Sequence, residues 1–248
     1  NPRFIQGVWG PYYGAMIPGM WLNEGGQSAT GSLIDLVIRN NSSHQEIIKV
    51  AKKSGIDIFT FLNRKVEEMK RKKGLEVVRN LHVLPYYHGN RSPRADPYAK
   101  GMVSGLTLSD TPEDVALLYY ATIQAIAYGT KHIIDAMNAE GYDILKIHLT
   151  GGHLKNRLFI QENADVTGCD IILPREPEAV LLGTAILAAV ASGEFSDILQ
   201  GMRSMSHAAK VVHPDSSTSS FHEAKYEIFK QMYDFQRSIH QKMESVKM

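Results

Sequence analysis

The sequence predicts an α/β fold in which a mixed or parallel sheet is flanked by helices. Short apolar runs typical of strands alternate with helical segments along most of the chain. Neither a repeat of about 20–50 residues nor a flexible linker interrupts this alternation. A length of 248 residues is enough to bury a substantial core. We therefore expect one domain over residues 1–248.

The first half of the chain is expected to hold short strands and several helices. Glycine, proline and aromatic residues are frequent in residues 1–24, which indicates irregular structure. A glycine loop then opens a helix, and Gly74 is placed to end a later one. The expected elements are one or two strands within 1–24, a helix after Gly31, two helices within 43–73, strands over 77–87 and 102–108, and a proline-rich loop over 88–101.

The second half continues the alternation. Ser109 or Asp110 is placed to cap a long helix, whose apolar residues recur every three or four positions from Val115 to Met137. The alanine-rich apolar helix over 176–192 is expected to be buried. The other expected elements are strands over 143–150, 169–174 and 210–214, a Gly-Gly turn at 151–152, and helices over 157–167, 195–205 and 221–247.

Composition excludes several function classes. With 27 Lys+Arg against 26 Asp+Glu, the net charge of +1 argues against a dedicated nucleic-acid binder. A single cysteine, Cys169, excludes an intrachain disulfide and a cysteine-built zinc site, and it fits the reducing cytoplasm. The histidines share no metal-ligand spacing, so we expect no metal held by the chain alone. No apolar run reaches the ~20 residues of a membrane span.

The segment from strand 143–150 through the Gly-Gly turn is the first candidate site. At Gly151 and Gly152 a phosphate or ribose can approach the backbone, because no Cβ stands in the way. The following helix points free N–H groups at the turn, and Lys155 and Asn156 add a cation and an amide. The spacing is neither that of a P-loop nor G-x-G-x-x-G. An ordinary tight turn remains the alternative on these residues alone.

Two further loops carry polar groups that could bind a ligand. The first, Gly25-Gly26-Gln27-Ser28, places a glycine pair and polar side chains at a helix start, and an ordinary capped helix start is its alternative. The second is the proline-pinned loop 88–97 with Arg91 and Asp96, for which a purely structural loop is the alternative. No G-x-S-x-G motif or catalytic carboxylate pair accompanies them.

Taken together, these motifs resemble the FGGY family of carbohydrate kinases. The family pattern has a strand, Gly-Gly-x-x-x-Asn, a helix with a Gln and an Asp, a glycine, a second strand, and a Glu followed by Gly-x-Ala. The matching residues are Gly151, Gly152, Asn156, Gln161, Asp165, Gly168, Glu178, Gly183 and Ala185. Loop 89–97 resembles the family's G-x-R-[ST]-P-x-x-D-P loop, and 23–31 is closest to the ribulokinase branch. The family's second signature is only partly kept, which leaves the subfamily open.

The resemblance implies an actin-like ATPase fold, with this chain as the C-terminal, ribonuclease H-like nucleotide-binding domain. The implied function is ATP-dependent phosphorylation of a sugar hydroxyl, on a pentulose such as D-ribulose, by in-line transfer with ATP and Mg²⁺ as cofactors. The implied nucleotide-binding residues are Gly151, Gly152, Lys155, Asn156, Gly25, Gly26, Gln27 and Ser28, supported by the loop residues Arg91 and Asp96. Thr184 and Ala185 are implied to pack behind them.

The resemblance also implies what a chain of this kind lacks. Its sugar-binding N-terminal domain, a Gly-Thr-Ser phosphate loop and the catalytic aspartate are expected upstream, since Asp35 and Asp96 lie outside the family's base motif. We therefore expect the isolated chain to be inactive. An inactive or regulatory fragment, a non-enzymatic interaction module and a phosphatase of the same superfamily remain alternatives, the last disfavoured by the Arg91/Asp96 loop. The oligomeric state stays open, because helix 221–247 can pack on its own domain or on a partner.

Overall fold

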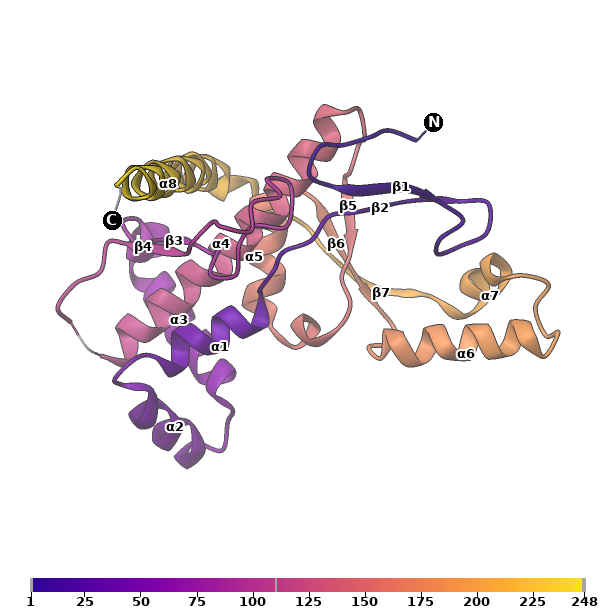
Figure 1. The fold of residues 1–248 in the computed structure, drawn as a ribbon. Helices are drawn as coiled ribbons and strands as arrows, with labels where there is room; N and C mark the ends of the chain where they lie inside the picture. Colours follow the sequence, from indigo (N-terminus) through magenta and orange to yellow (C-terminus); the bar gives the residue numbers. More distant parts are fainter. Residues whose placement is uncertain (1, 110, 247–248) are drawn as a thin grey trace.

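The computed structural model describes residues 2–109 and 111–246 and contains three small sheets (Figure 1). The antiparallel pairs are β1 (Trp9–Tyr13) with β2 (Trp21–Glu24), and β3 (His82–Leu84) with β4 (Met102–Ser104). In the third sheet, β6 (Asp170–Pro174) lies between a parallel β5 (Lys146–His148) and an antiparallel β7 (Ala208–Val212). This three-stranded sheet confirms the expected mixed pairing, although most strands are shorter than the sequence predicts.

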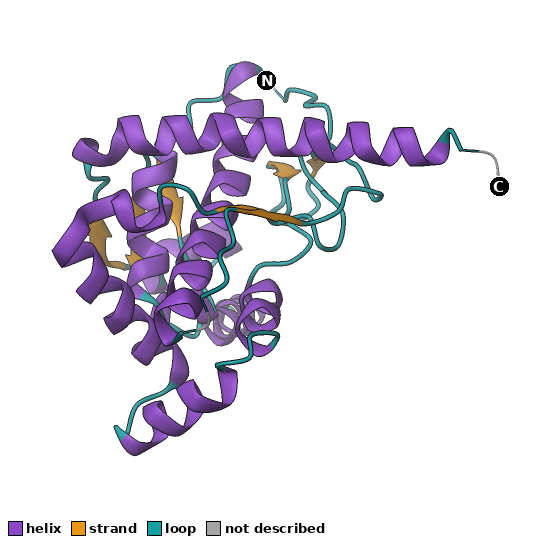
Figure 2. Ribbon diagram, turned by 90° about the vertical axis from the view of Figure 1, so that its left-hand side faces the viewer, coloured by secondary structure: helices purple, strands orange, loops and turns teal. Residues whose placement is uncertain are grey.

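Helices make up most of the remaining described structure (Figure 2). In chain order they are α1 (Gly31–Arg39), α2 (His44–Lys53), α3 (Ile58–Lys73), α4 (Pro112–Ala139), α5 (Arg157–Thr167), α6 (Ala179–Ala191), α7 (Ile198–Met205) and α8 (Ser219–Glu244), with short 3₁₀ helices at Gly74–Val78, Gly152–Lys155 and Ser216–Thr218. Within the part of the chain that the structure describes, none of these helices is both long and apolar enough to cross a lipid bilayer.

Helix α4 lies at the centre of the core. It packs against α1, α3, α5 and α8, and Tyr119, Tyr120 and Ile123 are fully buried on it. The apolar face predicted from Val115 onward is therefore only part of the buried surface of this helix. Because helices surround α4 on several sides, even polar residues such as Gln124 are buried there.

The cap predicted for this helix is wrong. Thr111 is the N-cap, and it forms a capping box in which its side chain accepts from the N–H of Asp114 and the Asp114 carboxylate accepts from the N–H of Thr111. Ser109 donates its hydroxyl hydrogen to the Asp114 carboxylate at 2.6 Å and so supports the cap from outside. Asp110, the other predicted cap, lies outside the described residues.

The expected burial of the alanine-rich helix is also wrong. Of the 13 residues of α6, all of them described, only Ile186 is buried, and Val180 is 84% exposed. Figure 1 shows α6 and α7 projecting together away from the helical body. The two helices pack on each other, and an apolar hollow of about 800 Å³ separates them from the ends of β5 and β6. The apolar composition of α6 therefore does not lead to burial in this chain.

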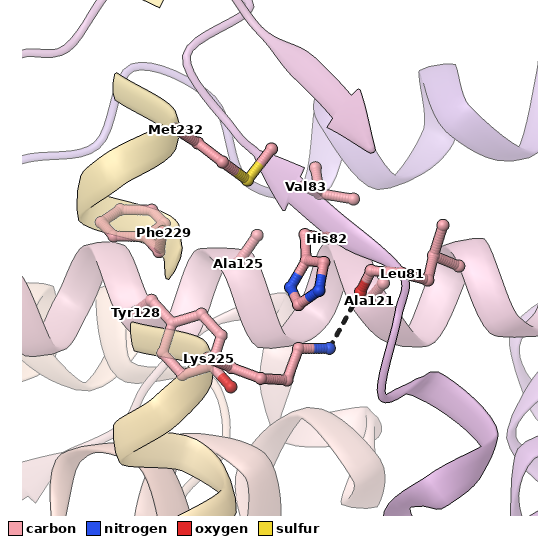
Figure 3. Close-up of a pocket in the computed structure, with 9 residues that line it drawn as sticks. All are labelled: Leu81, His82, Val83, Ala121, Ala125, Tyr128, Lys225, Phe229 and Met232. Atoms are coloured by element: carbon pink, nitrogen blue, oxygen red, sulfur yellow. Dashed lines mark hydrogen bonds between the residues drawn. The ribbon is translucent and has the colours of Figure 1, made fainter. Parts of the chain in front are cut away.

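Helix α8 is held to the core by a buried lysine. Lys225 is 5% exposed, and its Nζ donates to the carbonyls of Val78 (2.8 Å) and Leu81 (2.9 Å) and to Gln124 Oε1 (2.9 Å). Figure 3 shows this lysine reaching from α8 toward Leu81, and Phe229 comes from the same helix. Burial lowers the pKa of Lys225 to about 7, although the negative charge of Glu162 acts to raise it. The first half of α8 thus packs on its own domain.

We predict that Lys225→Met destabilises the chain, because the change removes the ammonium group that donates to three acceptors at once. The free energy of unfolding should fall by about 3 kcal/mol, measured by urea denaturation. Lys230→Met is the matched control, because Lys230 lies on the same helix but pairs with the exposed Glu227 and the Tyr226 ring, and not with buried carbonyls. Its effect should stay within about 0.5 kcal/mol. Equal effects of the two changes would contradict the assigned role of Lys225.

Candidate functional site

The beginnings of three helices meet around one hollow of about 560 Å³. Helices α1, α3 and α5 all start at its wall, so the positive ends of their dipoles converge there. Asp57 and Asn156 cap N–H groups of α3 and α5, whereas α1 has no side-chain cap. We call it the helix-terminal hollow. Its lining residues are Thr30, Gly31, Ile34, Asp35, Asp57, Phe59, Thr60, Asn63, Gly152, His153, Lys155 and Asn156. Such a concave site with mixed apolar and polar walls suits a small organic ligand that carries negative charge.

The Gly-Gly turn forms one edge of this hollow. Gly151 has φ +84° and ψ −162°, a backbone conformation that residues other than glycine rarely adopt. A Cβ placed on Gly152 would meet no atom of the described residues within 4 Å. Gly152 therefore borders the hollow with open space beside its backbone, whereas Gly151 is not among the lining residues.

Asn156 joins the turn to helix α5. As N-cap, its Oδ1 accepts from the N–H of Phe159 at 3.2 Å. The same oxygen accepts from Asn63 Nδ2 at 3.1 Å, and Asn156 Nδ2 donates to the Tyr119 hydroxyl at 2.7 Å. Asn156 therefore lines the hollow with a fixed side chain, beside Gly152 and Lys155.

His153 connects the turn to the beginning of α1. Its ring stacks on Phe159 with the centroids 4.0 Å apart, and its Nε2 lies 3.4 Å from Thr30 Oγ1. Burial lowers the pKa of His153, which favours the neutral ring. The histidine thus forms a packed, polar part of the wall of the hollow.

The structure does not bring Gln27 to the helix-terminal hollow. Its Nε2 donates to the Ile126 carbonyl at 3.0 Å and to Thr130 Oγ1 at 2.9 Å, both on α4. Gly25 is also packed on that helix, since a Cβ there would come within 2.5 Å of Ile133. Residues 23–31 form what we call the glycine segment. Of these residues, Thr30 and Gly31 at the start of α1 line the hollow instead.

Ser28 lies at a second hollow, also of about 560 Å³, which it lines together with Arg91. The Arg91 guanidinium lies over the Trp9 ring, 4.1 Å from its centroid, and 3.7 Å from a carboxylate oxygen of Glu24. The N–H of Ser92 donates to the carbonyl of Gly26 at 3.1 Å. The loop over residues 88–97, which we call the arginine loop, therefore packs on the glycine segment. Of that segment, Ser28 lines the second hollow and Thr30 lines the first.

Asp96 ties the arginine loop to α8. Its carboxylate accepts from the Tyr233 hydroxyl at 2.8 Å and from the N–H groups of Tyr98 and Ala99, and Arg237 lies 3.5 Å away. Burial alone would raise the pKa of Asp96, but these hydrogen bonds and the Arg237 charge outweigh it, and the pKa is lowered. Such a carboxylate is a poor proton acceptor.

Sequence reasoning missed several residues of the helix-terminal hollow. Phe59 and Asn63 come from α3, and no motif in that helix connects it with the Gly-Gly turn. Ile34 and Asp35 follow the glycine segment by one helical turn, which was the available signal for them. Thr184 and Ala185, implied to pack behind the nucleotide, lie instead on the projecting helix α6.

The sequence of this chain is similar to that of known carbohydrate kinases. The description "FGGY family of carbohydrate kinases, C-terminal domain" matches residues 1–192. The FGGY carbohydrate kinase domain-containing protein of Xenopus laevis is 49% identical over 96% of this chain. The D-ribulokinase of Saccharomyces cerevisiae is 38% identical over 79% of the chain. This chain covers 43% and 28% of these two relatives, respectively, and thus less than half of each.

Solved structures show the same fold. A xylulose kinase from Rhodospirillum rubrum superposes with a TM-score of 0.68 at 21% identity, over 90% of this chain and 41% of that one. The fold of the described residues is therefore that found in part of a sugar kinase. Together with the family match over residues 1–192, this means that the chain belongs to the FGGY family of carbohydrate kinases.

Proposed function

We propose that this chain is the C-terminal, nucleotide-binding domain of an ATP-dependent sugar kinase, with a ribonuclease H-like fold over residues 1–248. The helix-terminal hollow holds the adenosine end of ATP. One observation carries this assignment: three helix beginnings and the open backbone of Gly152 converge on a single hollow. Its membership in a carbohydrate kinase family supports the same ligand.

The walls of the hollow fit the parts of a nucleotide. Ile34 and Phe59 offer apolar surface to a flat base, and Asp35 offers acceptors to ribose hydroxyls. Lys155 and the N–H groups at the beginning of α1 suit the phosphate side. No side-chain cap occupies those N–H groups in α1, a helix that the structure describes in full. The chain's own residues therefore bind and orient the nucleotide.

Magnesium would enter with the nucleotide. Among the described residues, no group of three or more His, Cys, Asp or Glu side chains is placed to hold a metal ion. In phosphotransferases Mg²⁺ is usually held by one or two carboxylates together with substrate phosphates. Because Asp57 already caps α3 and Asp35 is given to the ribose here, the ion would be held mainly by the phosphates of the nucleotide. The ion would supply charge neutralisation for the transferred phosphoryl group.

The transfer itself needs groups from the rest of the whole protein. In-line phosphoryl transfer depends mainly on positioning and electrostatics. In this proposal the present chain positions the nucleotide. The sugar-binding domain, the phosphate loop and the catalytic base are assigned to the other half. Asp96 does not replace that base, since it is engaged by Tyr233 and Arg237, and Asp35 lies outside the family's base motif.

The substrate we propose is a pentulose, with D-ribulose first, in the cytoplasm. The support is the 38% identity to a D-ribulokinase and the ribulokinase-like glycine segment. A nucleotide-binding module without catalysis is the second candidate. The observation that favours it is the engagement of Asp96 in structural hydrogen bonds, which makes this carboxylate a poor base.

We predict that the full-length protein releases ADP from ATP·Mg²⁺ only when a pentulose is present, whereas this chain alone releases none. The reason is that the nucleotide site and the base lie on different halves. A coupled ADP assay with D-ribulose, D-xylulose and glycerol measures this directly. Full-length protein that binds ATP but phosphorylates no sugar would contradict the kinase assignment and favour the second candidate.

We predict that Gly152→Val weakens ATP binding at least tenfold without unfolding the chain. The added side chain enters open space in the helix-terminal hollow, because nothing lies within 4 Å of its Cβ position. Gly183→Val is the matched control, since Gly183 is equally open but lines the hollow beside α6. Isothermal titration of ATP·Mg²⁺ into each variant gives the comparison. If Gly183→Val weakens binding and Gly152→Val does not, the nucleotide lies in the other hollow.

A further inference from the structure

A closed ring of three hydrogen bonds lies at the wall of the helix-terminal hollow. Asn63 Nδ2 donates to Asn156 Oδ1 at 3.1 Å, Asn156 Nδ2 donates to the Tyr119 hydroxyl at 2.7 Å, and the Tyr119 hydroxyl donates to Asn63 Oδ1 at 2.9 Å. The three residues come from α3, α5's N-cap and α4. The ring therefore joins three helices at the proposed nucleotide site.

Two of the three side chains border the hollow and the third lies behind them. Asn63 and Asn156 both line the hollow, whereas Tyr119 is fully buried and is not part of its wall. A side-chain amide carries two N–H hydrogens, and the ring uses one from each asparagine. Each asparagine thus keeps one N–H for a ligand, and the two donors sit on hydrogen-bonded neighbours.

The buried hydroxyl orients the Asn63 amide, while the Asn156 amide is also oriented by the N–H of Phe159. Burial raises the pKa of Tyr119, so its hydroxyl stays protonated and donates one hydrogen while accepting another. The donated hydrogen requires the oxygen of Asn63, and the accepted one requires the nitrogen of Asn156. Without the hydroxyl, the Asn63 oxygen loses its donor and the Asn63 amide is free to turn over, whereas the Asn156 amide stays held by the N–H of Phe159.

We propose that Asn63 is a second nucleotide-contacting residue beside Asn156, and that Tyr119 is the positioning residue that holds the Asn63 amide with an N–H toward the ligand. Two adjacent N–H donors match acceptors on one side of a purine nucleoside, namely ring nitrogens and ribose oxygens. This inference rests on the proposed function, and it names the groups that read the base and ribose of that nucleotide.

The first test is Tyr119→Phe in the full-length protein, which removes the hydroxyl and keeps the aromatic ring. The KM for ATP should rise about three- to tenfold, with the KM for the sugar unchanged and kcat within about twofold. Tyr120→Phe is the matched control, because it removes an equally buried hydroxyl that donates to Glu162 instead. It should lower the melting temperature and leave the KM for ATP unchanged.

The second test separates contact from packing at Asn63. Asn63→Asp keeps an acceptor for the Tyr119 hydroxyl but removes both N–H donors, whereas Asn63→Ala removes both functions. Both should raise the KM for ATP by about three- to tenfold, while only Asn63→Ala loses the Tyr119 bond and more stability. This pair keeps the test decisive even if Tyr119→Phe does not fold.

The outcomes separate this inference from the proposed function. If the wild-type protein binds ATP but its KM is unchanged in Tyr119→Phe and Asn63→Asp, the inference is overturned and the proposed function stands. If Tyr119→Phe and Tyr120→Phe raise the KM for ATP equally, Tyr119 is only a packing residue and its positioning role is overturned. A wild-type protein that binds no ATP overturns both proposals.

Discussion

The packing of the surrounding helices around α4 is the constraint on which the remaining structure depends. Polar side chains along this one helix connect each neighbouring part to it: Tyr119 contacts the amides of Asn63 and Asn156, and Gln124 accepts from Lys225 of α8. Tyr120 and Gln124 also donate to the buried carboxylate of Glu162 on α5. Because a buried polar group without a partner is costly, these bonds fix the positions of α3, α5 and α8 around the same axis.

The same helix positions the glycine segment. Gly129 allows Gln27 to lie against α4, since a Cβ at this position would come within 2.4 Å of Gln27 Oε1. Gln27 in turn bonds to the Ile126 carbonyl and Thr130, one turn apart on α4. The segment therefore enters α1 at a defined place, and Thr30 and Gly31 reach the wall of the helix-terminal hollow. Substitutions at Gly129 should thus act on the hollow from a distance.

Local patterns in the sequence predicted the elements well and their assembly only in part. The Gly-Gly turn and helix 157–167 are found as predicted, because glycine conformation and helical periodicity are local properties. Gln27 does not lie beside Gly152, because its side chain bonds to the Ile126 carbonyl and Thr130 on α4, partners about a hundred residues away that no local pattern shows. Asn63 and Tyr119 could not be found from sequence, since their meeting depends on how α3 and α4 pack. The exposure of α6 likewise depends on what surrounds it.

The central claim is that ATP binds among the beginnings of α1, α3 and α5. Photolabelling of the full-length protein with an azido-ATP, followed by peptide mapping with and without excess ATP, tests it most directly. The account predicts labels that ATP suppresses within residues 30–35, 57–63 or 152–156, which line the helix-terminal hollow. Labels that ATP suppresses on α6 and α7, beside the larger apolar hollow, would contradict it.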